Sequence, residues 1–68
     1  MNDHVYKSIE ITGSSQRSAD DAVRIAIEKA SQTIKNLRWF KVTETRGVIE
    51  QGKIAYWQVT IHVGFTLE

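Results

Sequence analysis

Trp39 and Gln58 are the two side chains whose chemistry most suggests a ligand. A tryptophan indole offers a large flat face to a planar ring, and an amide can both donate and accept hydrogen bonds at the polar edge of such a ring. Both residues fall in β-rich segments, and strand alternation places Gln58 beside Trp39 on one face of the same sheet. Periodicity alone favours a plainer alternative, in which Trp39 is an interface aromatic and Gln58 is incidental.

The other side chains show no pattern typical of catalysis or metal binding. His4 and His62 have no partner at metal-ligand spacing, and the chain contains no cysteine. No glycine-rich phosphate loop or nucleophile motif is found, and Asp20 and Asp21 are better explained as helix-start charges. The sequence therefore predicts no catalytic residue, no metal site and no enzyme activity.

The charge pattern argues against nucleic acid and membranes as partners. Nine basic and eight acidic residues give a net charge of +1, and the two signs are mixed along the chain. No apolar run reaches the roughly 18 residues that cross a bilayer, and residues 1–4 lack the features of a signal peptide. We therefore expect a cytoplasmic protein with no nucleic-acid or membrane partner.

The first half of the chain predicts a strand, a loop and a helix. Residues 5–12 are rich in β-branched side chains, and residues 13–18 are small and polar. Apolar side chains then recur at helical spacing over about residues 19–35. Ser18 is suited to cap the start of this helix, and Asn36 is suited to end it in a left-handed conformation.

The second half predicts a β-hairpin. Residues 38–50 form one strand, in which Gly47 is expected to mark a bulge or bend, and Gln51–Gly52 is expected to form the turn. The returning strand has the clearest alternation in the chain. Its apolar positions, which should meet the helix, are Trp57, Val59, Ile61, Val63 and Phe65.

These elements predict one α+β domain over residues 1–68, in which one helix covers one face of a three-stranded antiparallel sheet. Phe40 is expected to point inward and Trp39 outward. A chain of 68 residues buries only about 60% of its unfolded surface, so we expect self-association to supplement the thin core. The uncovered face should carry Trp39, Lys41, Tyr56, Gln58, Thr60 and His62.

Several segments together resemble the dodecin family, over nearly the whole chain. In chain order they are Val5-Tyr6-Lys7, Gly13-Ser14-Ser15, Leu37-Arg38-Trp39-Phe40-Lys41-Val42, Thr45-Arg46-Gly47, Gln58-Val59-Thr60, Val63-Gly64-Phe65 and Leu67-Glu68. The alanine-rich helix fits the family as well.

The resemblance implies a β-α-β-β subunit whose sheet wraps around its helix, assembled into a hollow homododecamer. Dodecins bind flavins in pairs, in bacteria typically FMN, with the isoalloxazine rings stacked between tryptophans of neighbouring subunits. Riboflavin and FAD are related ligands, and some members also bind coenzyme A. The family's role is flavin storage and protection from light, without turnover.

The resemblance also implies roles for three residues. The stacking tryptophan falls on Trp39, the ring-edge amide on Gln58, and the arginine near the flavin on Arg46. For Arg46, a surface ion pair with Glu44 or Glu50 is an open alternative.

Two positions depart from the usual family pattern. Lys41 stands where many members have glutamate, and Thr66 stands where many have arginine. Our hypothesis is that the usual glutamate and arginine form an ion pair between subunits, and that this chain lacks that ion pair.

Two other functions stay open at this point. One is storage of coenzyme A or mixed nucleotide cofactors with weak flavin binding. The other is a flavin-dependent oxidoreductase, which a flavin stack closed on both faces disfavours because it leaves a substrate no room for hydride transfer.

Overall fold

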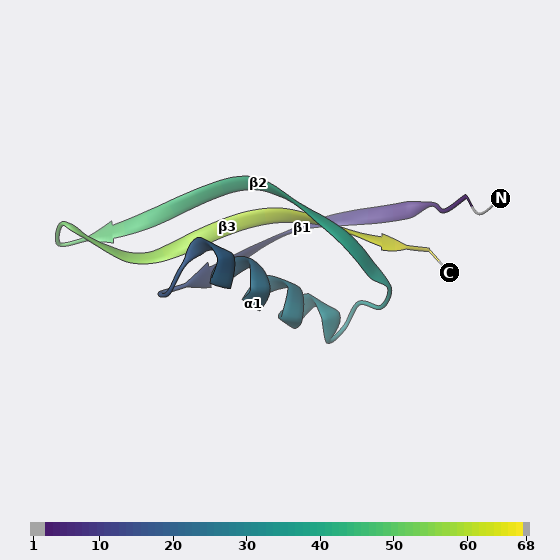
Figure 1. The fold of residues 1–68 in the computed structure, drawn as a ribbon, viewed down its shortest axis with the longest axis horizontal. Helices are drawn as coiled ribbons and strands as arrows, with labels where there is room; N and C mark the ends of the chain where they lie inside the picture. The colour runs from purple at the N-terminus through teal and green to yellow at the C-terminus, as the bar shows by residue number, and fades with distance from the viewer. Residues whose placement is uncertain (1–2, 68) are drawn as a thin grey trace.

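The computed structural model describes residues 3–67, and Figure 1 shows them as one sheet with one helix beneath it. The elements are β1 (Tyr6–Ser15), α1 (Ala19–Ser31), β2 (Leu37–Glu50) and β3 (Lys53–Thr66). The strands form an antiparallel sheet in the order β1-β3-β2 that curves around α1. The predicted α+β class and the β-α-β-β order are confirmed.

β1 is longer than predicted because its last residues hold the helix. Gly13 lies so close to α1 that an added Cβ would overlap the carbonyl of Ala22 and lie 2.8 Å from the Cβ of Ala26. The buried Ser15 hydroxyl donates to Asp21 Oδ2 at 2.7 Å. Residues 13–15, predicted to be loop, are therefore strand.

α1 starts where predicted but ends at Ser31 rather than near Lys35. The Ser31 hydroxyl donates to the carbonyl of Glu28 at 2.8 Å, and two later backbone N–H groups both donate to the carbonyl of Ala30. Such bonds back onto the last turn compete with continuation of the helix. Asn36 is left-handed as predicted, with φ of 68°, but it does not end the helix, because the C-cap is Gln32. Among residues 3–67, no helix has the length and apolar content needed to cross a membrane.

The β2–β3 hairpin turns at Gln51–Gly52, where both residues have positive φ, as in a type I′ turn. The predicted bulge at Gly47 is wrong, because Gly47 pairs regularly with Trp57 and leaves room for the ring of that side chain. The irregularities lie instead at Thr43 on β2 and Ala55 on β3, which have no cross-strand partner, and at the start of β2.

The core lies between α1 and the middle of the sheet. Its buried residues are Ala22, Ala26, Val59, Ile61 and Val63, so the alternation predicted for β3 is confirmed at its centre. α1 packs on β1 and β3, and the β2–β3 hairpin extends well beyond it (Figure 1). Phe40 does lie on the helix side, opposite Val63, but it is 49% exposed because α1 does not reach over β2.

We expect Gly13→Ala to destabilise the fold by about 1–3 kcal/mol, because the added methyl group forces α1 away from β1. Thermal unfolding measures this loss. Ser14→Ala, a substitution at the next residue on the opposite face of β1, should change stability by less than about 0.5 kcal/mol. Equal stability of the Gly13→Ala and wild-type proteins would contradict the close packing of β1 and α1.

The start of α1 predicts a loss of stability in acid. The hydrogen bond from the Ser15 hydroxyl, and then those from Arg24, lower the pKa of Asp21. A carboxylate with a lowered folded-state pKa stabilises the fold above its unfolded pKa and loses this contribution as the pH falls through the folded value. Asp21→Asn should therefore destabilise the protein near neutral pH, and the difference from wild type should shrink below about pH 4. Denaturant unfolding at both pH values tests this, and a difference that grows in acid would contradict it.

Candidate functional site

The face of the sheet opposite α1 carries the residues that the sequence analysis singled out, and we call it the open face. The three strands contribute to it in cross-strand rows. In order along the sheet the rows are Tyr6–Thr66, Ser8–Gly64–Trp39, Glu10–His62–Lys41, Thr12–Thr60–Glu44, Ser14–Gln58–Arg46 and Tyr56–Val48.

Trp39 lies over Gly64, its partner on β3. A Cβ added at Gly64 would overlap the six-membered ring of the indole and lie 2.6 Å from Nε1. Only a glycine at this position therefore lets the indole rest on the backbone of the sheet. The ring of Tyr6 meets the indole edge to face, with centroids 6.2 Å apart, and Trp39 is still 42% exposed. The result is an aromatic platform supported from below and accessible from outside.

Gln58 and Arg46 face each other across β3 and β2 at the other end of the open face. Arg46 forms an ion pair with Glu44, the alternative left open by its sequence. Gln58 lines a cavity of about 320 Å³ with Ser14, Gln16 and Tyr56 among its other lining residues. This end of the face is rich in hydroxyl and amide groups.

The prediction that Gln58 lies beside Trp39 is wrong, although both residues are on the open face as expected. Gly64, the partner of Trp39, is six residues further along β3 than Gln58, which is about 20 Å at the rise of a strand. Strand parity fixes the face of a residue but not its register. The position of the predicted turn would have given the register, because Trp39 lies twelve residues before Gln51 and Gly64 lies twelve residues after Gly52.

The unpaired residues Thr43 and Ala55 explain why this simple count works. Ala55 adds one residue to β3 and Thr43 adds one residue to β2, so, counting away from the turn, the two shifts cancel for residues 39–42 of β2. Residues 44–48 of β2 lie between the two irregularities, and the bulge at Thr43 puts them on the face opposite to the one that alternation from Trp39 predicts. It turns Arg46 onto the open face, where strict alternation from Trp39 would put it on the helix side.

Thr66, one of the two positions that depart from the family pattern, lies beside the aromatic platform. It pairs with Tyr6 on β1 and is only 5% exposed, and its buried hydroxyl has no hydrogen-bond partner among the described residues. Lys41 lies on the opposite side of Trp39, in the next row. The two positions at which the chain departs from the usual pattern therefore flank the tryptophan.

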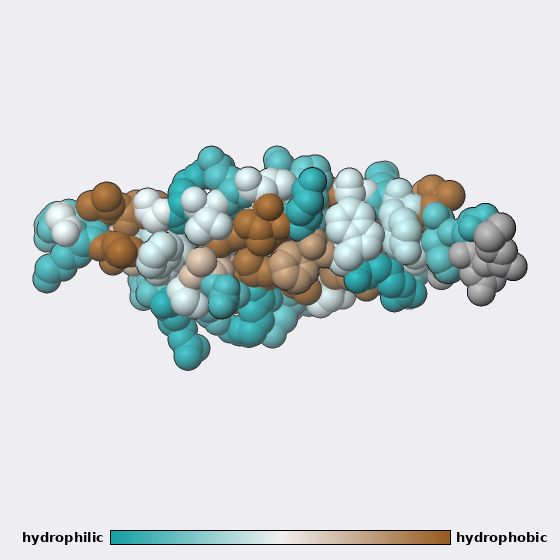
Figure 2. Space-filling model, turned by 45° about the horizontal axis from the view of Figure 1, so that its top comes forward, coloured by the Kyte–Doolittle hydropathy of each residue, from teal (hydrophilic) through white to brown (hydrophobic). Residues whose placement is uncertain are grey.

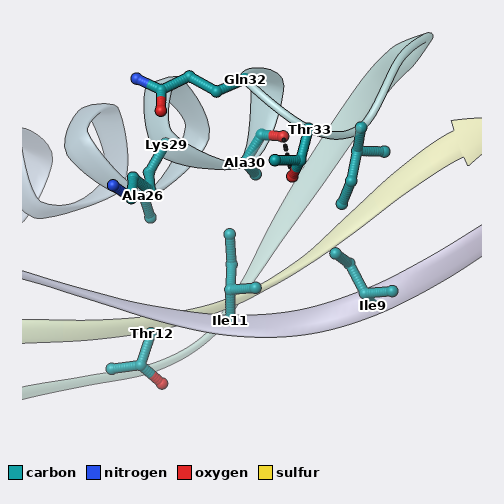
Figure 3. Close-up of a pocket in the computed structure, with 9 residues that line it drawn as sticks. Ile9, Ile11, Thr12, Ala26, Lys29, Ala30, Gln32 and Thr33 are labelled. Carbon is teal, nitrogen blue, oxygen red and sulfur yellow. Dashed lines mark hydrogen bonds between the residues drawn. The ribbon is translucent and has the colours of Figure 1, made fainter.

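A second cavity, of about 480 Å³, lies on the helix side of the sheet (Figure 3). In Figure 3, Ile9 and Ile11 from β1 point toward the last turns of α1, where Ala26 and Ala30 lie, while Thr12 points away. None of Trp39, Gln58 and Arg46 lines it. Its apolar lining suits a packing surface better than a site with specific polar contacts.

His62 lies in the row between Glu10 and Lys41, with Nε2 3.5 Å from Glu10 Oε2. Within residues 3–67, no group of three or more histidine, cysteine or acidic side chains is placed to hold a metal ion.

Comparison with known proteins identifies the family of this chain. Residues 5–68 match the sequence model of the family described as Dodecin. The chain belongs to the dodecin family. It is 39% identical over 64 residues to a dodecin of Thermus thermophilus, covering 94% of this chain and 93% of that one.

Solved dodecin structures share the fold. The dodecin from Streptomyces davaonensis superposes with a TM-score of 0.93 at 48% identity, with 98% of each chain covered. The dodecin from Streptomyces coelicolor gives 0.94 at 48% identity, covering 100% of this chain and 97% of that chain. Dodecins are oligomeric proteins that bind small ligands, and membership supports a flavin-binding storage role in general for this chain.

Because the indole of Trp39 lies directly on Gly64, we expect Gly64→Ala to displace it. Tryptophan emission should shift to longer wavelength as the ring moves into water, and flavin binding should weaken with it. The measurement uses a Trp57→Phe background, in which only Trp39 emits.

Gly47→Ala is a matched control, because a methyl group at Gly47 would lie 3.7 Å from the ring of Trp57, an ordinary contact. In the same Trp57→Phe background, this control should leave the emission of Trp39 unchanged. Unchanged emission in the Gly64→Ala protein would show that the indole does not depend on this glycine.

Proposed function

We propose that this dodecin stores FMN and protects it from light, with the isoalloxazine ring stacked on Trp39. The observation that carries the proposal is the half-exposed indole seated on Gly64 on the open face of the sheet. The lower side of the indole is supported by backbone, and its outer side is available to a planar ligand. Contact with an electron-rich indole would also quench the excited flavin and limit its photochemistry.

Gln58 and Arg46 complete the proposed site from another subunit. In one protomer they lie about 20 Å from the row of Trp39, which is longer than a flavin ring system. A single flavin therefore contacts Trp39 of one copy and the Gln58–Arg46 end of a neighbouring copy. Gln58 supplies a donor and an acceptor for the pyrimidine edge, and Arg46 supplies a planar cation.

Exposed apolar surface supports the proposed homododecamer. Ile49 and Ile54 pair near the hairpin turn and are 71% and 60% exposed. Figure 2 shows apolar side chains at the hairpin end, separate from those over the middle of the molecule. Phe40 and Val42 are also half exposed on the helix side of β2. Neighbouring copies that cover these residues would supply the burial that one helix does not.

The same proposal holds that the protein is cytoplasmic and acts by binding alone, without nucleic-acid or membrane partners. The +1 net charge and the mixed charge pattern support the absence of a nucleic-acid partner.

Titration of the apo-protein with FMN tests the proposal. We expect flavin fluorescence to be quenched, with saturation near one flavin per subunit. Trp39→Ala should weaken binding about 5- to 150-fold, because stacking of a planar ring on an aromatic side chain contributes about 1–3 kcal/mol.

Trp57→Phe is the control, since Trp57 lies on the helix side and should not contact the ligand. Size-exclusion chromatography should give the same oligomer for all three proteins. Unquenched flavin, or equal affinity of the Trp39→Ala and wild-type proteins, would exclude stacking on Trp39.

A further inference from the structure

Lys41 is an exposed cation next to the aromatic platform. It lies two residues after Trp39 on the same face of β2, about 7 Å away along the strand. Its ammonium group forms no ion pair among residues 3–67.

The nearest acidic side chains on the open face are engaged elsewhere. Glu44, beyond the bulge at Thr43, pairs with Arg46. Glu10 lies in the same row as Lys41 but two strands away, about 10 Å, and its carboxylate is near His62. Lys41 therefore leaves a positive charge beside Trp39 that no carboxylate in the described chain neutralises.

The other side of the platform carries no charge of this kind. It is formed by Tyr6 and by Thr66, whose hydroxyl is buried. Within one protomer, a ligand that stacks on Trp39 thus meets a neutral aromatic edge in one direction and a cation in the other. This asymmetry orients a planar ligand that has a negative charge on one side only.

We propose that Lys41 binds the phosphate of a phosphorylated flavin on Trp39, so that this protein selects FMN over riboflavin. The inference rests on the proposed stacking on Trp39 and names the group that distinguishes between flavins. FMN and riboflavin share the ring and the ribityl chain, and a phosphate monoester adds a charge of about −1.5 to −2 at neutral pH. A lysine ammonium binds such a group as a point charge. Arg46 of the same protomer is unsuited to this role, because it lies at the far end of the face and is paired with Glu44.

The test compares the dissociation constants of FMN and riboflavin, measured by quenching of flavin fluorescence. At low salt, the wild-type protein should bind FMN about three- to tenfold more tightly than riboflavin. The preference should shrink at about 0.5 M salt, where a partly exposed ion pair is screened. Lys41→Gln should bind both flavins within about twofold of each other and leave the riboflavin constant unchanged, and Lys41→Arg should keep the preference.

Lys7→Gln is the matched control, because Lys7 pairs with Phe65 at the same end of the sheet but on the helix side. It removes the same charge and should keep the FMN preference. The proposal is wrong if wild type shows no preference, if Lys41→Gln weakens both flavins equally, or if Lys7→Gln removes the preference as well.

Size-exclusion chromatography separates a role in assembly from a role in recognition. If Lys41→Gln changes the oligomer and Lys41→Arg does not restore the preference, Lys41 acts between subunits and the proposal is wrong. Failure of the wild-type protein to bind or quench either flavin would instead overturn stacking on Trp39, so the two failures are distinguishable.

Discussion

A single helix of 13 residues covers only part of a three-stranded sheet, and this limit shapes the whole protomer. α1 packs on β1 and β3 at a distance that Gly13 and the alanines of the helix permit. The buried core is therefore narrow, and β2 carries half-exposed side chains on both of its faces, Phe40 on one and Trp39 on the other. The same limit that thins the core leaves the aromatic platform accessible and leaves apolar surface for neighbouring copies.

Irregular strand pairing determines which residues lie together on the open face. The register shifts at Thr43 and Ala55 cancel, so the end of the hairpin away from the turn pairs as if both residues were absent. Between the two shifts the alternation along β2 is reversed, and Arg46 therefore lies with Gln58 on the open face. A bulge thus assembles two chemically different ends on one face, an aromatic end at Trp39 and a polar end at Gln58.

The sequence was most informative where a local signal coincides with the final structure. The Ser18 cap, the left-handed Asn36, the Gln51–Gly52 turn and the alternation centred on Ile61 all depend on neighbours along the chain. Other expectations failed because contacts between elements decide them. β1 continues to Ser15 because the helix binds there, and both the expected bulge at Gly47 and the expected closeness of Trp39 and Gln58 were wrong because they depend on the cross-strand register. The end of α1 is a local feature, set by bonds back to Glu28 and Ala30 that the apolar periodicity does not show.

The contact between Trp39 and Gly64 restricts the number of subunits that an assembly can contain. Since the backbone of the sheet supports one side of the indole, each protomer has only one face of the Trp39 indole to offer to a ligand. A ligand stack enclosed on both sides by tryptophan therefore needs two protomers facing each other across a two-fold axis. Closed shells in which every site is filled in this way contain an even number of subunits, and a ring of three or five copies would leave at least one indole uncovered.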